Sequence, residues 1–292
     1  MKFFYFKPVL IGYWISTYLL ETILSSTGDA IEVSLDLGLT FRRYALKGRH
    51  SAKILVVSEG IHIDLERLRR IVRGKETVYY SSEGISWSPI AVFQGGKYYR
   101  LRAVGAYEAP TLEISGIHMH NIKHATPWRD AERKVSLLRV RTGDKLLEIG
   151  TGLGYTAIHS ARRGADVLSI EKDEVVLKIA SYNPWSRELS SRNIKIVLGD
   201  ASIVVRDLPS EAFDKVLHDP PRFALAGELY SRDFYAELFR VLRRGGYLFH
   251  YTGAPKSRRG VDLQRGVVRR LREVGFTVTQ VIREYGVLAR KL

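Results

Sequence analysis

The chain has 292 residues, no cysteine and a formal net charge of +15, with 46 Lys and Arg against 31 Asp and Glu. The lack of cysteine excludes a disulfide scaffold, a thiolate zinc site and a cysteine nucleophile, and it fits a reducing cytoplasm. The length predicts two domains, and a hydrophobic content of 45% predicts that they are globular rather than disordered.

The positive charge is concentrated in two segments, 42–75 and 256–292, which each contain 10 basic and 3 acidic residues. A basic surface attracts nucleic acid or an anionic membrane. The alternative is the solvated surface of a thermophile, but such surfaces usually gain Glu along with Lys and Arg. The sequence therefore favours nucleic acid as the partner.

The first segment with a distinct pattern is 8–24, which is apolar apart from Glu21 and several hydroxyl-bearing residues. Its 17 residues are at the lower limit for a membrane span, and Glu21 lies near its end. No A-x-A cleavage pattern follows it, so a signal peptide is disfavoured. We expect a helix docked on the first domain and no stable membrane association.

Short β-type runs separated by Gly, Ser, Asn and Asp dominate the chain before about residue 140. One helix is predicted after the cap residue Asp64, with Leu65 and Leu68 on its apolar face and Gly74 at its end. Its other face is basic, and either lies in solvent or contacts phosphates. We expect a smaller, mostly β N-terminal domain over residues 1–110. Its strands are predicted at 31–37, 40–46, 53–57, 77–80, 90–93 and 98–103.

After residue 140 strands and helices alternate, which predicts a parallel sheet with helices on both faces. The strands are predicted at 145–149, 166–171, 194–199, 213–218 and 246–251, and the helices near 156–163, 173–183, 203–207 and 231–242. The chain is completed by a helix over 265–274 and two strands, 276–282 and 286–291. We expect these last strands to form an antiparallel hairpin at the edge of the sheet.

A glycine-rich loop follows the first of these strands and contains Glu148, Gly150, Gly152, Gly154, Tyr155 and Thr156. Glycine lets the backbone turn sharply and lets a ligand approach the main chain closely. The dinucleotide-binding fingerprint is disfavoured, because it needs a third glycine where Tyr155 stands. The E-x-G-x-G-x-G pattern resembles motif I of the class I S-adenosylmethionine-dependent methyltransferases, and the resemblance implies S-adenosylmethionine as the cofactor.

Acidic residues at the ends of the next two strands extend this resemblance. Glu171, followed by Lys172, ends the second strand, where a carboxylate accepts hydrogen bonds from ribose hydroxyls. Asp200, followed by Ala201, ends the third strand, a position that lies beside the adenine in the methyltransferase family. Each acid alone is most simply a solvated strand end, but in this order they match the family. The resemblance implies that these four residues and the glycine-rich loop bind the cofactor. It implies a Rossmann-like, seven-stranded methyltransferase domain of the α/β class over residues 111–292.

The fourth strand ends in Asp219, Pro220, Pro221, Arg222 and Phe223. This run resembles the D/N-P-P-Y/F motif of methyltransferases that modify amino groups on nucleobases, and it implies that the first four residues are catalytic. An exocyclic base nitrogen becomes nucleophilic only when acceptors hold its N–H groups, and Asp219 and the Pro220 carbonyl can do so. Arg222 replaces the usual stacking aromatic residue, although a guanidinium also stacks on a base. The alternative is a rigid corner between strand and loop.

The resemblance extends beyond these motifs. An archaeal family of predicted methyltransferases looks similar over most of the chain after residue 30, most clearly at 116–120, 127–130, 183–185, 218–230 and 250–253. It implies an N-methyltransferase that modifies the exocyclic amine of a base in structured RNA, which is the expected partner. The sharpest expectation from this resemblance is cytidine N4 in small-subunit rRNA.

Two other functions are left open. Members of this family have been labelled spermidine-synthase-like, which implies aminopropyl or small-molecule amine transfer. A cationic polyamine favours acidic walls, so the positive charge counts against this alternative. The other is a non-catalytic RNA-binding protein, which the intact glycine-rich loop and D-P-P sequence disfavour.

Several residues around the motifs are expected to line the substrate pocket, namely His118, His120, Asp130, Phe223, His250 and Tyr251. Asp130 lies before the first strand, where this fold often closes over the cofactor. His250 and Tyr251 end the fifth strand, where they either face the ligand crevice or pack as aromatic residues, and the earlier histidines are alternatively ordinary packed side chains. The three histidines of 118–124 come without an H-E-x-x-H pattern, so we expect no metal site. Nothing in the sequence indicates the oligomeric state.

Overall fold

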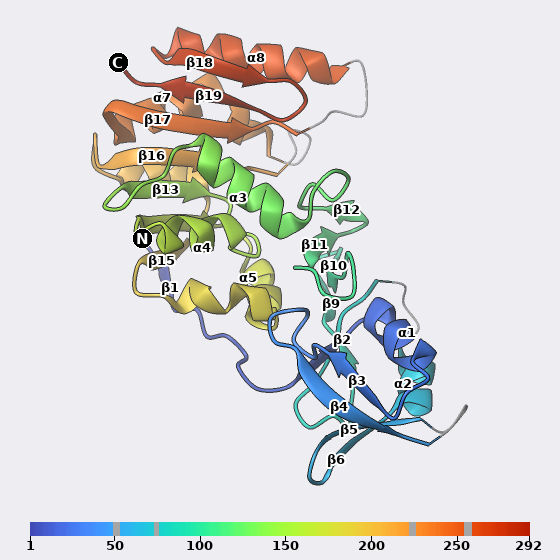
Figure 1. The fold of residues 1–292 in the computed structure, drawn as a ribbon. Coiled ribbons are helices and arrows are strands. Elements are labelled where there is room, and N and C mark those ends of the chain that lie inside the picture. Colours follow the sequence, from blue (N-terminus) through green and yellow to red (C-terminus); the bar gives the residue numbers. More distant parts are fainter. Residues whose placement is uncertain (49–52, 73–75, 222–225, 254–258) are drawn as a thin grey trace. The chain divides into compact units, whose positions relative to one another are not determined.

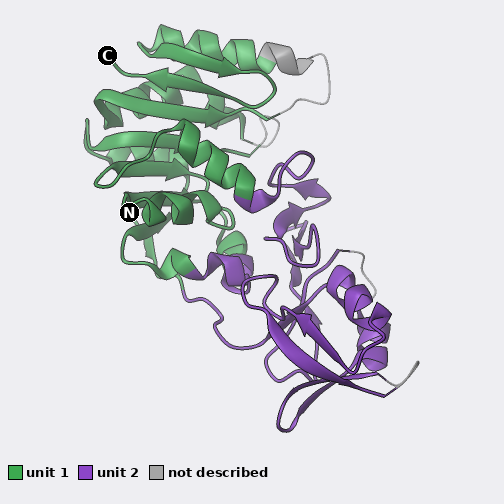
Figure 2. Cartoon of the chain, viewed as in Figure 1, with its two compact units in different colours: residues 1–6, 129–177, 188–292 green, residues 7–128, 178–187 purple. Residues whose placement is uncertain are grey.

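The structure is a computed structural model, and it describes residues 1–48, 53–72, 76–221, 226–253 and 259–292. The chain folds into two compact units, coloured separately in Figure 2. The first unit consists of residues 1–6, 129–177 and 188–292, and the second of residues 7–128 and 178–187. The sequence predicted a boundary near residue 110. In the structure the second unit runs to residue 128 and contains the last antiparallel strand pair, β11 and β12, which ends at His118.

The first unit is built on a mixed sheet of eight described strands, in the order β1-β15-β14-β13-β16-β17-β19-β18 (Figure 1). Its five central strands are parallel, as the apolar runs of the sequence predicted. They are β15 (Ile194–Leu198), β14 (Asp166–Glu171), β13 (Lys145–Ile149), β16 (Phe213–His218) and β17 (Leu242–Tyr251). The expected antiparallel hairpin lies at one edge and consists of β18 (Thr277–Ile282) and β19 (Gly286–Arg290).

The strand at the opposite edge has no counterpart in the sequence prediction. β1 (Phe3–Phe4) pairs antiparallel with β15, with Phe3 opposite Val197 and Phe4 opposite Ile196. The sheet therefore has eight described strands where seven were expected, and the chain's amino end supplies the extra one. Two residues are too short a run for a period-two pattern to mark them as a strand.

Helices cover the sheet of the first unit and supply much of its core. α7 (Arg232–Val241) begins after Ser231, whose side chain accepts a hydrogen bond from the Phe234 N–H at 3.1 Å. Its residues Phe234, Leu238 and Val241 recur at helical spacing and are buried against the sheet. The other α-helices here are α3 (Pro127–Leu137), α4 (Tyr155–Arg162), α5 (Glu174–Ser181), α6 (Ala201–Val204) and α8 (Arg259–Glu273).

The second unit contains three antiparallel sheets and two α-helices among its described residues. α1 (Thr17–Ser25) lies in the segment predicted as a docked helix, and it buries Leu19, Leu20 and Ile23. No helix in the described part of the chain is both long and apolar enough to cross a lipid bilayer. α2 (Leu65–Ile71) begins after Asp64 as predicted, whereas its predicted end, Gly74, falls outside the described residues.

The strands of the second unit are short and follow one another closely. They are β2 (Tyr13–Ile15), β3 (Ala30–Val33), β4 (Arg42–Lys47), β5 (Ile54–Ser58), β6 (Ile61–Asp64), β7 (Tyr79–Ser81), β8 (Ser88–Pro89), β9 (Ala91–Gln94), β10 (Lys97–Arg102), β11 (Thr111–Ile114) and β12 (Ile117–His118). The side chains of β4 and β10 alternate between more buried and more exposed positions, as expected for sheets with one solvated face.

Candidate active site

The glycine-rich loop joins the carboxyl end of β13 to the start of α4 and turns sharply. Gly150 has a φ of 91° and Gly152 a φ of 56°, values that favour glycine. A Cβ atom on Gly150 would lie 2.7 Å from the Asp219 carbonyl oxygen, so the loop and the D-P-P corner are in main-chain contact. A Cβ atom on Gly152 would have no neighbour within 4 Å among the described residues. The loop is therefore open to a ligand at Gly152, while Gly154 caps α4.

Three of the predicted cofactor-binding residues lie beneath this loop rather than on its surface. Glu148 is fully buried and accepts hydrogen bonds from Thr156 and from the Ser169 hydroxyl, the latter at 2.5 Å. Tyr155 and Thr156 are buried as well. Burial raises the pKa of Glu148 to about 7, although the two hydroxyls stabilise its carboxylate. These three residues therefore support the loop from the interior, and their contact with a cofactor stays a prediction.

The carboxylate that ends β14 lies against the glycine-rich loop. Glu171 Oε2 accepts the Gly152 N–H at 3.0 Å, and Glu171 Oε1 accepts the Asp173 N–H at 3.0 Å. Burial raises the pKa of Glu171. Each carboxylate oxygen can accept a further hydrogen bond, so Glu171 can hold the loop and a ligand together.

The carboxylate that follows β15 caps a helix and pairs with a lysine. Asp200 Oδ1 accepts the Ser202 N–H at 2.9 Å, at the start of α6. Its other oxygen lies 2.6 Å from the Lys172 ammonium, whose side chain is 67% exposed. Ala201 is the first residue of α6 and is buried. Because β13, β14 and β15 run parallel, their carboxyl ends bring the predicted cofactor residues to one edge of the sheet.

The D-P-P corner follows β16, the strand next to β13. The Asp219 N–H donates to the Ile149 carbonyl oxygen at 3.1 Å, which holds the corner against the end of β13. Tyr230 donates its hydroxyl to the Pro221 carbonyl oxygen at 3.0 Å. Pro220 between them is buried. The corner is therefore fixed at the same edge as the glycine-rich loop.

A lysine that has no place in the sequence prediction holds the carboxylate of Asp219. Lys134 comes from α3, and its Nζ lies 2.7 Å from Asp219 Oδ2 and 3.1 Å from Asp130 Oδ2. The Lys134 side chain is 2% exposed and that of Asp219 20%. Asp130 and Lys134 are four residues apart and share one face of the helix. That spacing is visible in the sequence, but it does not reveal the third partner at position 219.

Two tyrosines complete the surroundings of Lys134. Tyr285 donates its hydroxyl to Asp130 Oδ1 at 2.9 Å, and the Lys134 ammonium lies 3.9 Å from the centre of the Tyr251 ring. Burial acts to lower the pKa of Lys134, but the carboxylates of Asp219 and Asp130 outweigh it and hold that pKa above its ordinary value. Burial raises the pKa of Asp219, and the Lys134 ammonium opposes that increase. We call these five residues the Lys134 cluster.

His250, which was expected to face the ligand crevice, is fully buried. Its ring centre lies 4.2 Å from that of His218, and the Tyr235 hydroxyl lies 3.0 Å from its Nε2. Burial lowers the pKa of His218 to about 3 and that of His250 well below its ordinary value. Both rings are therefore packed inside the unit, which agrees with the packing alternative for His250.

The remaining predicted substrate residues stay predictions. His118 ends β12 in the second unit, where its Nε2 lies 3.4 Å from Glu113 Oε2, and His120 follows it. Burial lowers the pKa of His118. Arg222 and Phe223 lie outside the described residues, so their stacking on a base is not tested.

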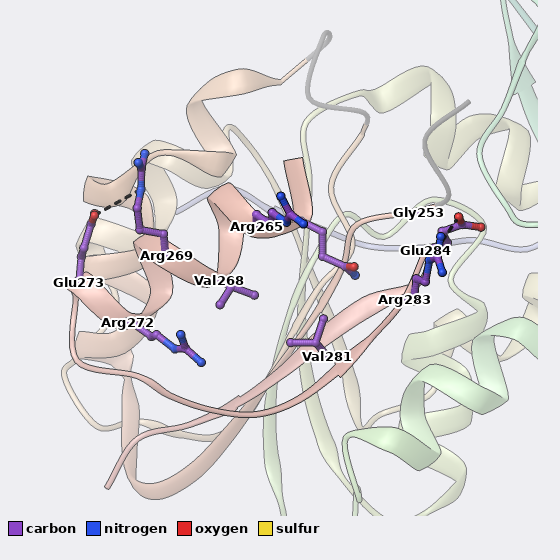
Figure 3. Close-up of a pocket in the computed structure, with 10 residues that line it drawn as sticks. Gly253, Arg265, Val268, Arg269, Arg272, Glu273, Val281, Arg283 and Glu284 are labelled. Atoms are coloured by element: carbon purple, nitrogen blue, oxygen red, sulfur yellow. Dashed lines mark ion pairs between the residues drawn. The ribbon is translucent and has the colours of Figure 1, made fainter. Parts of the chain in front are cut away.

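A hollow of about 800 Å³ lies in the first unit, between α8 and β18 (Figure 3). Arg265, Arg269 and Arg272 of α8 line it together with Arg283, which follows β18. The Arg269 side chain is 73% exposed and lies 3.5 Å from Glu273, a geometry that contributes little to stability. Exposed guanidinium groups present donors that match phosphate. The hollow is therefore lined by four arginines and by two acidic residues, Glu273 and Glu284.

Comparison with known proteins identifies relatives for the whole chain and for the first unit. Residues 147–250 match the family model described as "Methyltransferase domain". The chain is 42% identical over 285 residues to an uncharacterized protein of Methanocaldococcus jannaschii, which covers 97% of each chain. It is 34% identical over 91 residues to a 23S rRNA (uracil(1939)-C(5))-methyltransferase of Acidithiobacillus ferrooxidans, or 31% of this chain and 21% of that protein. A spermidine synthase structure superposes with a TM-score of 0.56 at 18% identity, covering 69% of this chain and 73% of that one, which is a likeness of fold.

Proposed function

Because the chain belongs to the family of the Methanocaldococcus jannaschii protein and carries the methyltransferase domain, it is a class I S-adenosylmethionine-dependent methyltransferase, and we propose that it methylates the exocyclic amine of a base in structured RNA. The observation that carries this proposal is the contact between the two motifs. The Asp219 main chain bonds to Ile149 and approaches Gly150, so an amine held by Asp219 would lie beside the cofactor loop.

The residues at the sheet edge fit the cofactor. The open side of Gly152 leaves room for the ligand against the main chain, and Glu171 beside it has acceptor capacity left for ribose hydroxyls. Asp200 ends the neighbouring strand, where the family places the adenine. When bound, S-adenosylmethionine supplies an electrophilic methyl group: a nitrogen–carbon bond forms while the carbon–sulfur bond breaks and its electron pair passes to sulfur.

The chain's own contribution is to make the amine nucleophilic and to take its proton. A base amine is conjugated with its ring, and acceptors that hold its N–H groups pull the nitrogen toward a tetrahedral shape. Asp219 and the Pro220 carbonyl are the proposed acceptors. The nitrogen is positively charged once it carries the methyl group, and Asp219 is the nearest proposed acceptor for the proton that it loses.

The net charge of the chain and its similarity to an rRNA methyltransferase support RNA over a polyamine as the substrate. The net charge of +15 and the arginine-lined hollow favour a polyanion, and one relative methylates rRNA. The likeness to spermidine synthase is one of fold, and a basic protein repels a polycation. Within RNA, cytidine N4 of the small ribosomal subunit remains the sharpest proposal, which would make the cytoplasm the site of action.

A transfer assay with two pairs of reactants tests this choice. One arm combines methyl-labelled S-adenosylmethionine with total RNA, and the other combines its decarboxylated form with putrescine. We expect label in RNA and no aminopropyl product. An aminopropylated polyamine, with no label in RNA, would establish the alternative.

A further inference from the structure

Lys134 is the least expected member of the site, because a buried lysine is costly unless anions surround it. Its Nζ touches Asp219 Oδ2 at 2.7 Å and Asp130 Oδ2 at 3.1 Å, and it lies over the Tyr251 ring. Asp130 is itself fixed by the Tyr285 hydroxyl at 2.9 Å. The ammonium is therefore held in one place by groups from three separate segments of the chain.

We propose that Lys134 is a positioning residue for methyl transfer: it occupies Oδ2 of Asp219 and leaves Oδ1 to accept the N–H of the target amine. This inference rests on the proposed function, since it assigns a role to Lys134 only if Asp219 holds the amine. Lys134 touches neither the amine nor the cofactor in this scheme, and it acts through Asp219.

The first argument is geometric. A free aspartate carboxylate rotates broadly about its last torsion and exchanges its two oxygens. The bond from Lys134 fixes that rotation, while the Asp219 N–H bond to Ile149 fixes the main chain. The two acceptors proposed for the amine, Oδ1 and the adjacent Pro220 carbonyl, thus keep a constant separation, which is what an oriented reaction requires.

The second argument is electrostatic. A protonated carboxyl oxygen donates a hydrogen bond, so Asp219 must be ionised to accept one from the amine. The other acids near it are Asp130 on α3 and Glu148 on β13, while Tyr230 and Tyr285 have raised pKa values and stay neutral. Lys134 supplies the opposing positive charge in direct contact. Its two carboxylate partners keep Lys134 protonated, so it cannot serve as the base that removes the amine's proton.

The test compares Lys134→Met and Lys134→Arg with the wild type in single-turnover methyl transfer to RNA across a range of pH. We expect Lys134→Met to lose roughly 10²-fold in rate at neutral pH, the order contributed by one oriented polar partner. The rate should recover in part as the pH rises and Asp219 ionises, because the ionised carboxylate still lacks the contact that fixes its rotation. Lys134→Arg keeps the charge and should retain the wild-type pH profile.

Two further variants separate positioning from folding. Lys134→Met with Asp130→Asn removes one of the carboxylates left behind, and it should fold while keeping the shifted pH profile. Lys291→Met is the matched control, because Lys291 is also buried and bonds to the Phe239 and Leu242 carbonyls and to Glu211. It should lose stability without a change in pH profile.

The inference is overturned if folded Lys134→Met transfers methyl at the wild-type rate, or if its loss is the same at every pH. Asp219→Ala serves as the reference. If that variant keeps the wild-type rate, the proposed function of the D-P-P corner fails. If it is inactive while Lys134→Met behaves as the wild type, only the role of Lys134 fails.

Discussion

Replacement of Asp219 by alanine should separate methyl transfer from cofactor binding. The carboxylate is proposed to hold the amine, whereas the cofactor would contact the glycine-rich loop, Glu171 and Asp200. A preorganised polar group that acts in the transition state contributes about 10²–10³-fold in rate. We expect Asp219→Ala to lose this factor in kcat and to keep its affinity for S-adenosylmethionine. Asp219→Asn should retain more activity, because an amide oxygen still accepts one hydrogen bond.

The structure also sets the cost of this replacement in stability. Loss of one partner of a buried ion pair destabilises a protein by about 3–5 kcal/mol. Here Asp219 is 20% exposed, and Asp130 still lies 3.1 Å from the Lys134 ammonium. We therefore expect a loss near the low end, about 3 kcal/mol, in the free energy of unfolding by urea. Adding Lys134→Met should cost less than the two single changes together, because the partners are coupled.

The assay is single-turnover transfer of labelled methyl to RNA, alongside calorimetric binding of the cofactor to the same folded variants. A wild-type rate in Asp219→Ala would make the D-P-P run merely a corner in the chain. Loss of cofactor binding in folded Asp219→Ala would refute the claim that Asp219 acts only on the amine, because it would show that Asp219 contacts the cofactor.

Glu171→Ala should weaken cofactor binding by about 10- to 150-fold, since a hydrogen bond to a charged acceptor contributes roughly 1.5–3 kcal/mol; unchanged calorimetric binding would remove Glu171 from the site. Burial lowers the pKa of His218 to about 3, so between pH 6.5 and 3 the unfolded chain binds the extra proton and stability falls as the pH falls. His218→Phe should reduce the dependence of the free energy of unfolding on pH by up to about 1.4 kcal/mol per pH unit, measured by urea unfolding. An unchanged dependence would contradict the lowered pKa of His218. If Arg265 and Arg272 contact phosphate, Arg265→Ala and Arg272→Ala should each reduce the slope of log K for RNA binding against log salt concentration by about 0.7–0.9. Arg192 is exposed before β15 and serves as the control, so Arg192→Ala should leave the slope unchanged. Equal slopes in all three variants would mean that the arginines of the hollow contact solvent and not RNA.

The fold of the sheet edge that carries the candidate site was predictable because its signals are local. A buried parallel strand is a continuous apolar run, and the loop after β13 needs glycine at positions of positive φ. The predicted bounds of β13, β14 and β16 agree with the structure to the residue. Glu171 lies beside Gly152 because neighbouring parallel strands end together.

The apolar runs of the parallel strands did not show in which direction a polar side chain faces. When both faces of a strand are covered, alternation no longer distinguishes the interior from the ligand edge. The sequence therefore did not show that Glu148 and His250 are both fully buried. Lys134 was missed for another reason: its contact with Asp219 joins positions 85 residues apart, and no local pattern records it.

The central claim is that this chain transfers methyl groups to the exocyclic amine of an RNA base. Its most direct test is mass spectrometry of nucleosides from RNA of a strain that lacks the gene, before and after incubation with the purified protein and deuterated S-adenosylmethionine. The account predicts a deuterated nucleoside with its methyl on the exocyclic nitrogen, N4-methylated cytidine by the sharpest proposal, and its much slower formation with Asp219→Ala. Deuterium on a ring carbon or a ribose, or none in any nucleoside, would contradict it.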